Sequence, residues 1–392
     1  MDSKTKIIKL IRRFILLLFL LSFCSNFQCQ ESKVSRDIAM ESSSLKQTHL
    51  SFGFKRIIIS ITLGLISGLV GALIFVSIVR FVVVYMNRAP LLKGPVIFSL
   101  KIMPSKLLSA VEEENHLLGS SSCGKYYKIV LDNELIMAAK KLEPFEVGSP
   151  ERQSKSVKRK MQKELEILAS LKHENLMILR AYVRDSDRFT LVYDYIANEN
   201  LEDIMLKMRQ NQLELGWDVR LNIALRIIKC LRYLHFECSP QILHYNLKPT
   251  NVLLDSDLQP RITDFGLAML IPFSKRASSP YTAPEFLQTC RYTEKSEIYS
   301  FGMILAVLLT GRDPCEAFFK EEACRGSLDN WLRHLLVEGE AREALDCKLL
   351  VEDDEDEMLM VLRIAVVCLS ELPADRPCSD ELVSMLSQLH RF

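Results

Sequence analysis

Two apolar runs stand out near the start of the chain. The first, at residues 14–23, follows a basic stretch, and this pattern predicts a signal sequence or signal anchor over residues 1–25. The second, at residues 57–79, contains no charged residue. Because a membrane-spanning helix needs about 20 consecutive apolar residues, we expect one transmembrane helix within residues 56–86.

Polar segments flank the predicted span. Residues 26–55 are rich in Ser and too few to bury a core, so we expect a short extracytoplasmic segment without a ligand-binding domain of its own. Residues 87–108 contain Pro and Gly and are expected to form a juxtamembrane linker. Whether the first apolar run is cleaved or is retained with its basic end in the cytosol, residues 109–390 are expected to be cytosolic.

The pattern from residue 109 onward is that of a globular domain. Apolar runs typical of strands come first, at residues 125–131, 135–142 and 189–196. A helical period follows in LNIALRIIKCLRYLHF. The residues expected on its buried face are Leu221, Ala224, Leu225, Ile228 and Leu231. Strands early and helices late predict an α+β fold with a small β-rich lobe and a larger helical lobe.

Composition narrows the possible functions. The formal net charge is +1 and no basic stripe is present, which argues against a nucleic-acid-binding protein. The chain has 11 cysteines but no Cys-x-x-Cys pair, so no zinc site is expected. We interpret the cysteines beyond the span as reduced cytosolic thiols.

Several stretches of the globular region carry residues suited to holding phosphate. LLGSSSCGKYYK offers Gly119 and Gly124, and a backbone can approach phosphate closely only where no Cβ intrudes. Lys140 lies in the strand-like MAAK, and Glu164 lies in a helical stretch at a spacing suited to an ion pair with it. Taken alone, each of these charged residues is more often a solvated surface group.

Later stretches add further polar residues in a fixed order. HYNLKPTN contains Asn246, Lys248 and Asn251, and ITDFGLA contains Asp264. The order and spacing of all these stretches resemble the plant receptor-like kinase family. Further segments with the same resemblance are KHENLMILRAY, EIYSFGMILAVLLTGRDP and ELPADRPCSDELVSML.

The resemblance implies a two-lobed protein-kinase-like domain over residues 109–390, with ATP and magnesium as cofactors. The residues that it implicates in binding the nucleotide are Gly119, Gly124, Lys140, Glu164, Asn251 and Asp264. Within this set, Asn251 and Asp264 would hold magnesium. Lys248 would contact the transferred phosphate, and position 246 would hold the catalytic base.

The catalytic loop departs from the family pattern. Asn246 stands where the family has the Asp that accepts the substrate's proton, and an amide has the same shape but is no base. Losing a general base costs ~10²–10⁴ in rate. Tyr245 replaces the Arg that would dock a phosphate on the activation segment. Glu297 is one methylene longer than the family's Asp, and we expect it to miss the usual bonds to the loop backbone.

The glycine-rich stretch departs from the pattern as well. Ser121 stands at the position of the middle Gly, and Tyr126 stands where the family has the Val that packs on the base. We expect a poorer lid over the phosphates, and therefore weak or vestigial binding of ATP and magnesium.

These features predict an inactive family member, a membrane-bound pseudokinase that acts as co-receptor and signalling scaffold at the plasma membrane. The resemblance implies peptide-hormone signalling of the CLAVATA type in the meristem. It also implies a partner, a leucine-rich-repeat receptor-like protein that lacks a kinase domain. Two alternatives stay open: an active serine/threonine receptor-like kinase with an atypical loop, and a membrane adaptor that needs no nucleotide.

Small residues recur along the predicted span. Ser60, Gly64, Gly68 and Ala72 are spaced four apart and therefore lie on one face of a helix. Such a face lets a second helix approach closely in a membrane. We expect it to contact the span of the partner receptor or a second copy of this chain.

Overall fold

The computed structural model describes residues 46–86, 94–113, 116–121, 124–131, 134–143, 151–185, 188–197, 199–267, 279–320, 326–350 and 354–389. The chain divides into two compact units, Met1–Arg88 and Ala89–Phe392, and each is described by itself. The predicted signal sequence or anchor at residues 1–25 lies outside the described residues.

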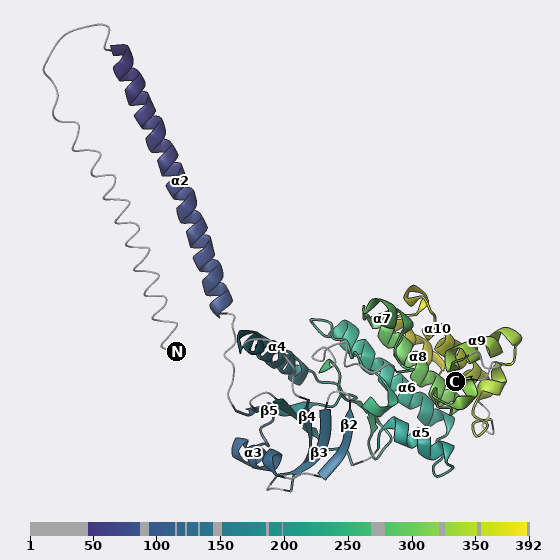
Figure 1. Cartoon of the computed structure of the whole chain (residues 1–392). Helices are drawn as coiled ribbons and strands as arrows, with labels where there is room; N and C mark the ends of the chain where they lie inside the picture. Colours follow the sequence, from purple (N-terminus) through teal and green to yellow (C-terminus); the bar gives the residue numbers. More distant parts are fainter. Residues whose placement is uncertain are drawn as a thin grey trace. The chain divides into compact units, whose positions relative to one another are not determined.

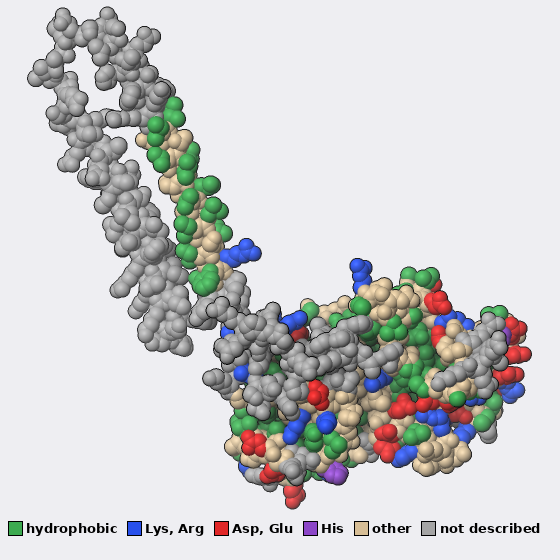
Figure 2. Space-filling model, in the orientation of Figure 1, with side chains coloured by type: hydrophobic (Ala, Val, Ile, Leu, Met, Phe, Trp, Pro, Cys, Tyr) green, Lys and Arg blue, Asp and Glu red, His purple; other side chains and the backbone are tan. Residues whose placement is uncertain are grey.

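The described part of the first unit is one long helix, α2, Lys46–Met86 (Figure 1). Within it, Ile58–Val82 is apolar and long enough to cross a membrane, and none of it is buried against the protein. The helix begins ten residues before the predicted span, because no Pro interrupts its hydrogen bonding there. Hydrophobic side chains predominate on the described part of α2, which also carries the exposed Arg80, whereas charged side chains of both signs lie over the second unit (Figure 2).

Two hydroxyl groups within the span donate hydrogen bonds to carbonyls of the helix itself. Thr62 Oγ1 donates to the Ile58 carbonyl at 3.0 Å, and Ser67 Oγ donates to the Gly64 carbonyl at 3.0 Å. Unsatisfied polar groups are costly in hydrocarbon, so these bonds make Thr62 and Ser67 compatible with a lipid environment.

The small lobe of the second unit is an antiparallel sheet in the order β1-β5-β6-β4-β3-β2. The strands are β1 Val96–Ile97, β2 His116–Ser121, β3 Gly124–Val130, β4 Ile136–Leu142, β5 Leu179–Asp185 and β6 Arg188–Asp194. The three strands predicted from apolar runs are present as β3, β4 and β6. Helix α4, Glu151–Ser170, connects β4 to β5 along the chain (Figure 1).

The globular fold begins earlier than the predicted boundary at residue 109. β1 pairs with β5, and the following helix α3, Pro104–Glu112, packs onto the sheet. Leu107 and Val111 lie one helical turn apart and are buried with Ile129 in a small-lobe core. The second half of the predicted linker is therefore part of the domain.

The large lobe is helical and also contains a short β7–β8 hairpin. Its main elements are α5 Leu201–Arg209, α6 Trp217–Arg232, β7 Val252–Leu254, β8 Pro260–Ile262, α7 Pro284–Thr289, α8 Glu294–Thr310, α9 Leu328–Glu338, α10 Glu355–Cys368 and α11 Ser379–Leu389. Short helical turns lie at Tyr233–Glu237, Pro249–Asn251, Ala317–Lys320, Ala341–Ala344 and Pro373–Asp375. All the residues predicted on the buried face of α6 are buried.

Helix α8 forms the centre of the large lobe. A capping box between Thr293 and Ser296 fixes its start, and Gly311, with φ 67°, ends it in the left-handed conformation. Apart from its first two residues, the helix is buried against α6, α9 and α10. This position places Glu297, in the first turn, beneath the catalytic loop.

Candidate functional site

A cavity of about 420 Å³ lies between the two lobes. It is lined by residues of the glycine-rich stretch, of the segment that links the lobes and of the catalytic loop, among them Gly119, Tyr126, Tyr195, Lys248, Asn251 and Thr263. Of the predicted nucleotide-binding residues, Gly119 and Asn251 line this cavity, whereas Gly124, Lys140, Glu164 and Asp264 do not. Lys140 and Asp264 are buried beside Tyr126.

The pairing of β3 with β4 places Tyr126 beside Lys140. The two are direct partners across the strands, so their side chains project from the same face of the sheet. The Lys140 ammonium lies 4.6 Å from the centre of the Tyr126 ring. A cation over an aromatic face is stabilised by about 0.5–2 kcal/mol, more when it is desolvated.

Asp264 completes a cluster with these two residues. Lys140 Nζ donates to Asp264 Oδ2 at 2.5 Å and to the Tyr126 hydroxyl at 3.0 Å. The Tyr126 hydroxyl donates to Asp264 Oδ1. Burial, followed by the negative charge of Asp264, raises the pKa of Tyr126 well above its ordinary value, so the hydroxyl stays protonated and remains a donor.

This cluster occupies the groups that ATP and magnesium would need. Both carboxylate oxygens of Asp264 accept hydrogen bonds, and the Lys140 side chain is fully buried in the same cluster. A metal ion needs carboxylate oxygens, and a phosphate needs the ammonium. In the conformation described, these residues therefore do not fit a magnesium–nucleotide.

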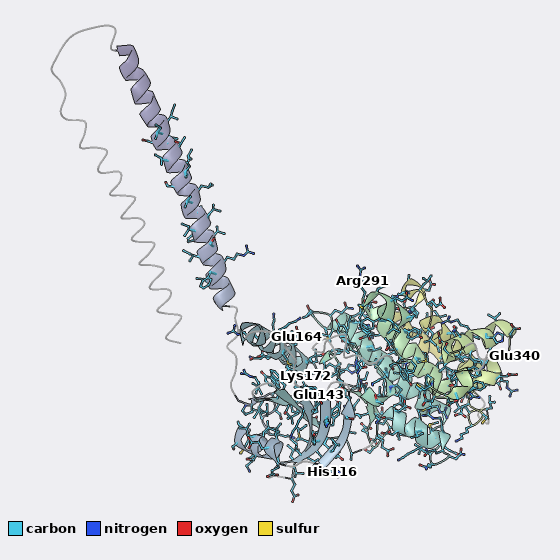
Figure 3. The ribbon with its side chains drawn as sticks, in the orientation of Figure 1. His116, Glu143, Glu164, Lys172, Arg291 and Glu340 are labelled. Atoms are coloured by element: carbon cyan, nitrogen blue, oxygen red, sulfur yellow. The ribbon has the colours of Figure 1, made fainter. Side chains whose placement is uncertain are left out.

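Glu164 does not make the predicted pair with Lys140. It lies half-buried on α4 (Figure 3), and no contact between these two side chains occurs in the described structure. The ammonium group instead donates to Asp264 and to the Tyr126 hydroxyl.

The glycine-rich stretch uses its two glycines differently. Gly124 has φ 152°, and a Cβ there would lie 2.2 Å from the Lys141 carbonyl oxygen, so only glycine allows β3 to pair with β4 at this point. At Gly119 a Cβ would meet nothing within 4 Å. Gly119 lines the cavity and Gly124 does not, which gives Gly124 a structural role.

The catalytic loop keeps the geometry of a phosphotransfer site without the base. Asn251 Nδ2 donates to the Asn246 carbonyl at 2.7 Å, and the Thr263 amide donates to the Asn251 carbonyl at 2.9 Å. Lys248 and Asn251 line the cavity as predicted residues of the site. The amide of Asn246 cannot accept a proton from a hydroxyl nucleophile at neutral pH.

Glu297 does bond to the catalytic loop, contrary to expectation. Its Oε1 accepts from the Tyr245 amide at 2.8 Å, and its Oε2 lies 2.7 Å from His235 Nε2. The extra methylene is accommodated because His235 holds the far oxygen. Tyr245 adopts φ 66°, a strained conformation for a non-glycine residue, and its ring stacks on Tyr292 at 4.9 Å. Position 245 therefore makes an aromatic contact, where the family has an Arg that docks a phosphate.

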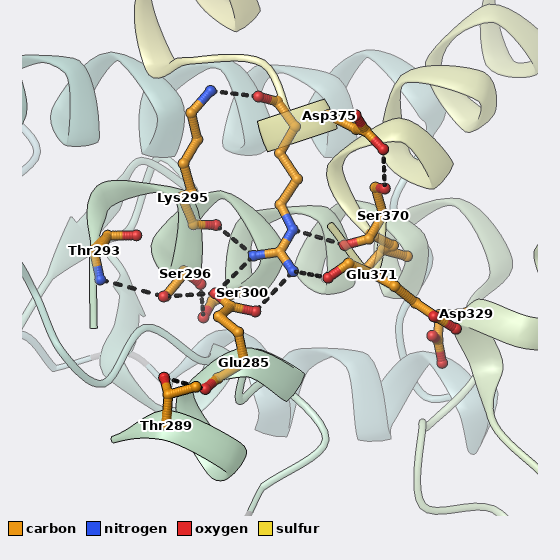
Figure 4. A network of polar contacts seen from close by, with 12 residues as sticks. Glu285, Thr289, Thr293, Lys295, Ser296, Ser300, Asp329, Ser370, Glu371 and Asp375 are labelled. Atoms are coloured by element: carbon orange, nitrogen blue, oxygen red, sulfur yellow. Dashed lines mark hydrogen bonds and ion pairs between the residues drawn. The ribbon is translucent and has the colours of Figure 1, made fainter. Parts of the chain in front are cut away.

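A second polar network lies outside the cavity, at the end of the activation segment (Figure 4). Arg376 donates from Nη1 and Nη2 to the two oxygens of Glu285 at 2.9 and 2.8 Å. It also donates to the carbonyls of Ser370 and Lys295. Burial raises the pKa of Glu285, but hydrogen bonds from Arg376 and Ser296 outweigh it, and the pKa falls below its ordinary value.

The contact between Tyr126 and Asp264 does not follow from motif spacing. The available signal was an aromatic residue at a position that the family fills with Val, which we interpreted only as a poorer lid. The register of β3 against β4 would have placed Tyr126 beside Lys140, because it pairs these two residues.

Comparisons with known proteins agree with this architecture. Residues 112–386 match the family model described as the protein kinase domain. The chain belongs to the protein kinase family. Over 318 residues it is 60% identical to the inactive leucine-rich repeat receptor-like protein kinase CORYNE of Arabidopsis thaliana, covering 80% of this chain and 79% of that protein.

Two further matches extend the comparison. The receptor-like serine/threonine/tyrosine-protein kinase SOBIR1 of A. thaliana is 36% identical over 76% of this chain, which spans about half (49%) of that longer relative. A solved structure of the pseudokinase domain of BIR2, an immune regulator of the RLK/Pelle family, superposes with a TM-score of 0.62 at 26% identity. It covers 78% of this chain and 93% of that chain. This member of the kinase family is therefore a receptor-like pseudokinase with an apolar helix suited to one membrane crossing.

Proposed function

We propose that this chain is a plasma-membrane co-receptor whose kinase-like domain acts as a signalling scaffold. The observation that carries the proposal is the combination of an intact kinase fold with Asn246 at the position of the base. The loop around Asn246 is held in place by Asn251 and Glu297 although it lacks the group that would do the chemistry. A scaffold requires a folded surface that partners can bind, and it does not require catalysis.

The partner in this proposal is a leucine-rich-repeat receptor-like protein that lacks a kinase domain, in CLAVATA-type peptide-hormone signalling in the meristem. Support comes from the identity with CORYNE, whose name describes an inactive receptor-like kinase. The predicted extracytoplasmic segment, residues 26–55, is too short to bind a ligand alone. A partner would supply the receptor exterior.

The scaffold proposal is tested by removing residual phosphotransfer without disturbing the fold. Lys248 lines the cavity and is partly exposed, so Lys248→Ala leaves the buried cluster of Tyr126, Lys140 and Asp264 intact. In cells whose own copy of the gene is disrupted, the variant is expected to restore signalling to within about twofold of the wild type, because a scaffold needs the fold of the domain and not the transfer of phosphate. Loss of signalling at normal protein levels would favour the alternative of an active kinase.

Assembly through the membrane is a separate prediction. The side chains of α2 from Ile58 to Phe81 are exposed, and a Cβ at Gly64 or Gly68 would meet nothing within the chain. Gly64→Ile together with Gly68→Ile is expected to reduce co-purification of the partner receptor, or of a second tagged copy, by at least about tenfold, because the enlarged side chains keep the helices apart.

The matched control for this prediction is Leu65→Ile together with Leu69→Ile, which changes another face of α2 without changing side-chain volume. Both double variants should insert into membranes equally well. Unchanged co-purification of the glycine double variant would mean that assembly runs through other parts of the chain.

One alternative, an adaptor that needs no nucleotide, is favoured by a specific observation. The Tyr126 hydroxyl and Lys140 occupy both oxygens of Asp264, so the closed conformation needs no nucleotide to hold it. Weak binding of ATP and magnesium stays a prediction, and it requires this cluster to open.

A further inference from the structure

We propose that Tyr126 is the specificity-determining residue of the cleft. It acts as an internal ligand of Lys140 and Asp264 and excludes magnesium–nucleotide from an otherwise formed binding site. The closed cluster of Tyr126, Lys140 and Asp264 thus weakens nucleotide binding more than the departures in the glycine-rich stretch do.

The first support is geometric. Tyr126 projects from β3 directly opposite Lys140 on β4, and its hydroxyl reaches across the cleft to Asp264, which follows β8 in the other lobe. The side chain therefore bridges the two lobes. The groups it contacts are those that the kinase pattern assigns to phosphate and to metal.

The second support is the division of the cleft. The cavity of about 420 Å³ reaches Tyr126, Asn251 and Thr263, but Lys140 and Asp264 have no exposed side-chain surface. The outer part of the site is open and the inner, charged part is sealed. Since the Tyr126 ring forms part of the wall between them, this one residue accounts for the seal.

The third support is chemical. Buried charges need partners. Here the Lys140 ammonium and the Asp264 carboxylate pair with each other, and the neutral Tyr126 hydroxyl bonds to both. A hydrogen bond to a charged group is worth enough to favour the closed form by about 10- to 100-fold. The apparent affinity for a ligand that needs the open form falls by that factor.

The test measures magnesium–ATP binding to the full-length protein in detergent micelles or nanodiscs, by titration calorimetry with excess magnesium and again with EDTA. Tyr126→Val removes the ring and the hydroxyl and places at this position the side chain typical of the family. It is expected to tighten magnesium–ATP binding by about 10- to 100-fold. The gain in affinity should disappear in EDTA, because the freed Asp264 carboxylate would bind the nucleotide only through magnesium.

Two further variants separate this proposal from a general effect on the fold. Tyr126→Phe keeps the ring and removes only the hydroxyl, so it should give a smaller, magnesium-dependent gain. Tyr127→Val makes the same substitution one residue along β3, on the opposite face, where the ring lies near Lys141. It should bind as the wild type does.

The proposal is overturned if Tyr126→Val folds but binds magnesium–ATP no more tightly than the wild type, or if Tyr127→Val gains equally. Folding is checked by the melting temperature without ligand. If Tyr126→Val does not fold, Tyr126→Phe decides, and an unchanged affinity for that variant overturns the proposal.

Discussion

Replacing Arg376 with alanine is expected to lower the free energy of unfolding of the globular unit by about 3–5 kcal/mol. Arg376 is 1% exposed, and its guanidinium group joins Glu285 to the segment that precedes α11. Truncation leaves the Glu285 carboxylate, which is 18% exposed, without its charged partner. It also leaves the carbonyls of Ser370 and Lys295 without their donor.

Chemical denaturation of the full-length protein in detergent, followed by the fluorescence of Trp217 and Trp331, measures this effect. Arg363→Ala is the control, because Arg363 is exposed on α10, and its loss should change the free energy by no more than about 0.5 kcal/mol. Equal stability of the two variants would show that the Arg376 network contributes little.

Phosphotransfer by the wild-type protein is expected to be at least ~10²–10⁴ slower than that of an active relative assayed in parallel, because Asn246 cannot take up the substrate's proton and the closed cluster also withholds Asp264 from the nucleotide. Asn246→Asp alone should recover little of this rate, because Tyr126 still holds Asp264. The double variant with Tyr126→Val should recover more than the two single changes together, since the two defects act on one site.

Radiolabelled phosphate transfer to a generic protein substrate measures these rates. Asn246→Ala serves as the control, because it removes an amide that is already no base, and it should match the wild type. Wild-type activity equal to that of the active relative, and lost in Lys248→Ala, would contradict the prediction and the scaffold proposal with it.

The sequence predicted the parts of the fold that depend on local burial. The apolar runs of β3, β4 and β6 and the helical period of α6 indicate which residues face a core, and these elements are present. The start of the domain was placed too late because β1 has only two residues and α3 is short. Neither gives a period long enough to recognise.

Motif spacing indicated some of the residues around the cleft, but not the contacts that they make. Motif spacing placed Lys140 and Asp264 in one cleft, and the structure joins them in an ion pair. Which partner Lys140 takes depends on side-chain geometry across two lobes, and Tyr126 reaches it where Glu164 does not. Glu297 was misjudged for a similar reason, since His235, far away in the sequence, decides how its longer side chain is used.

The short strand β1 determines how much of the chain must be kept for the globular unit to remain soluble. β1 covers the outer edge of β5 through Tyr182 and Ala181, and Leu107 of α3 lies against the same sheet. A fragment that begins at residue 109 would expose the unpaired amide and carbonyl groups of β5 beside freshly exposed apolar surface. Such an edge is a template for aggregation by strand addition. A fragment that begins at residue 94 keeps this edge paired.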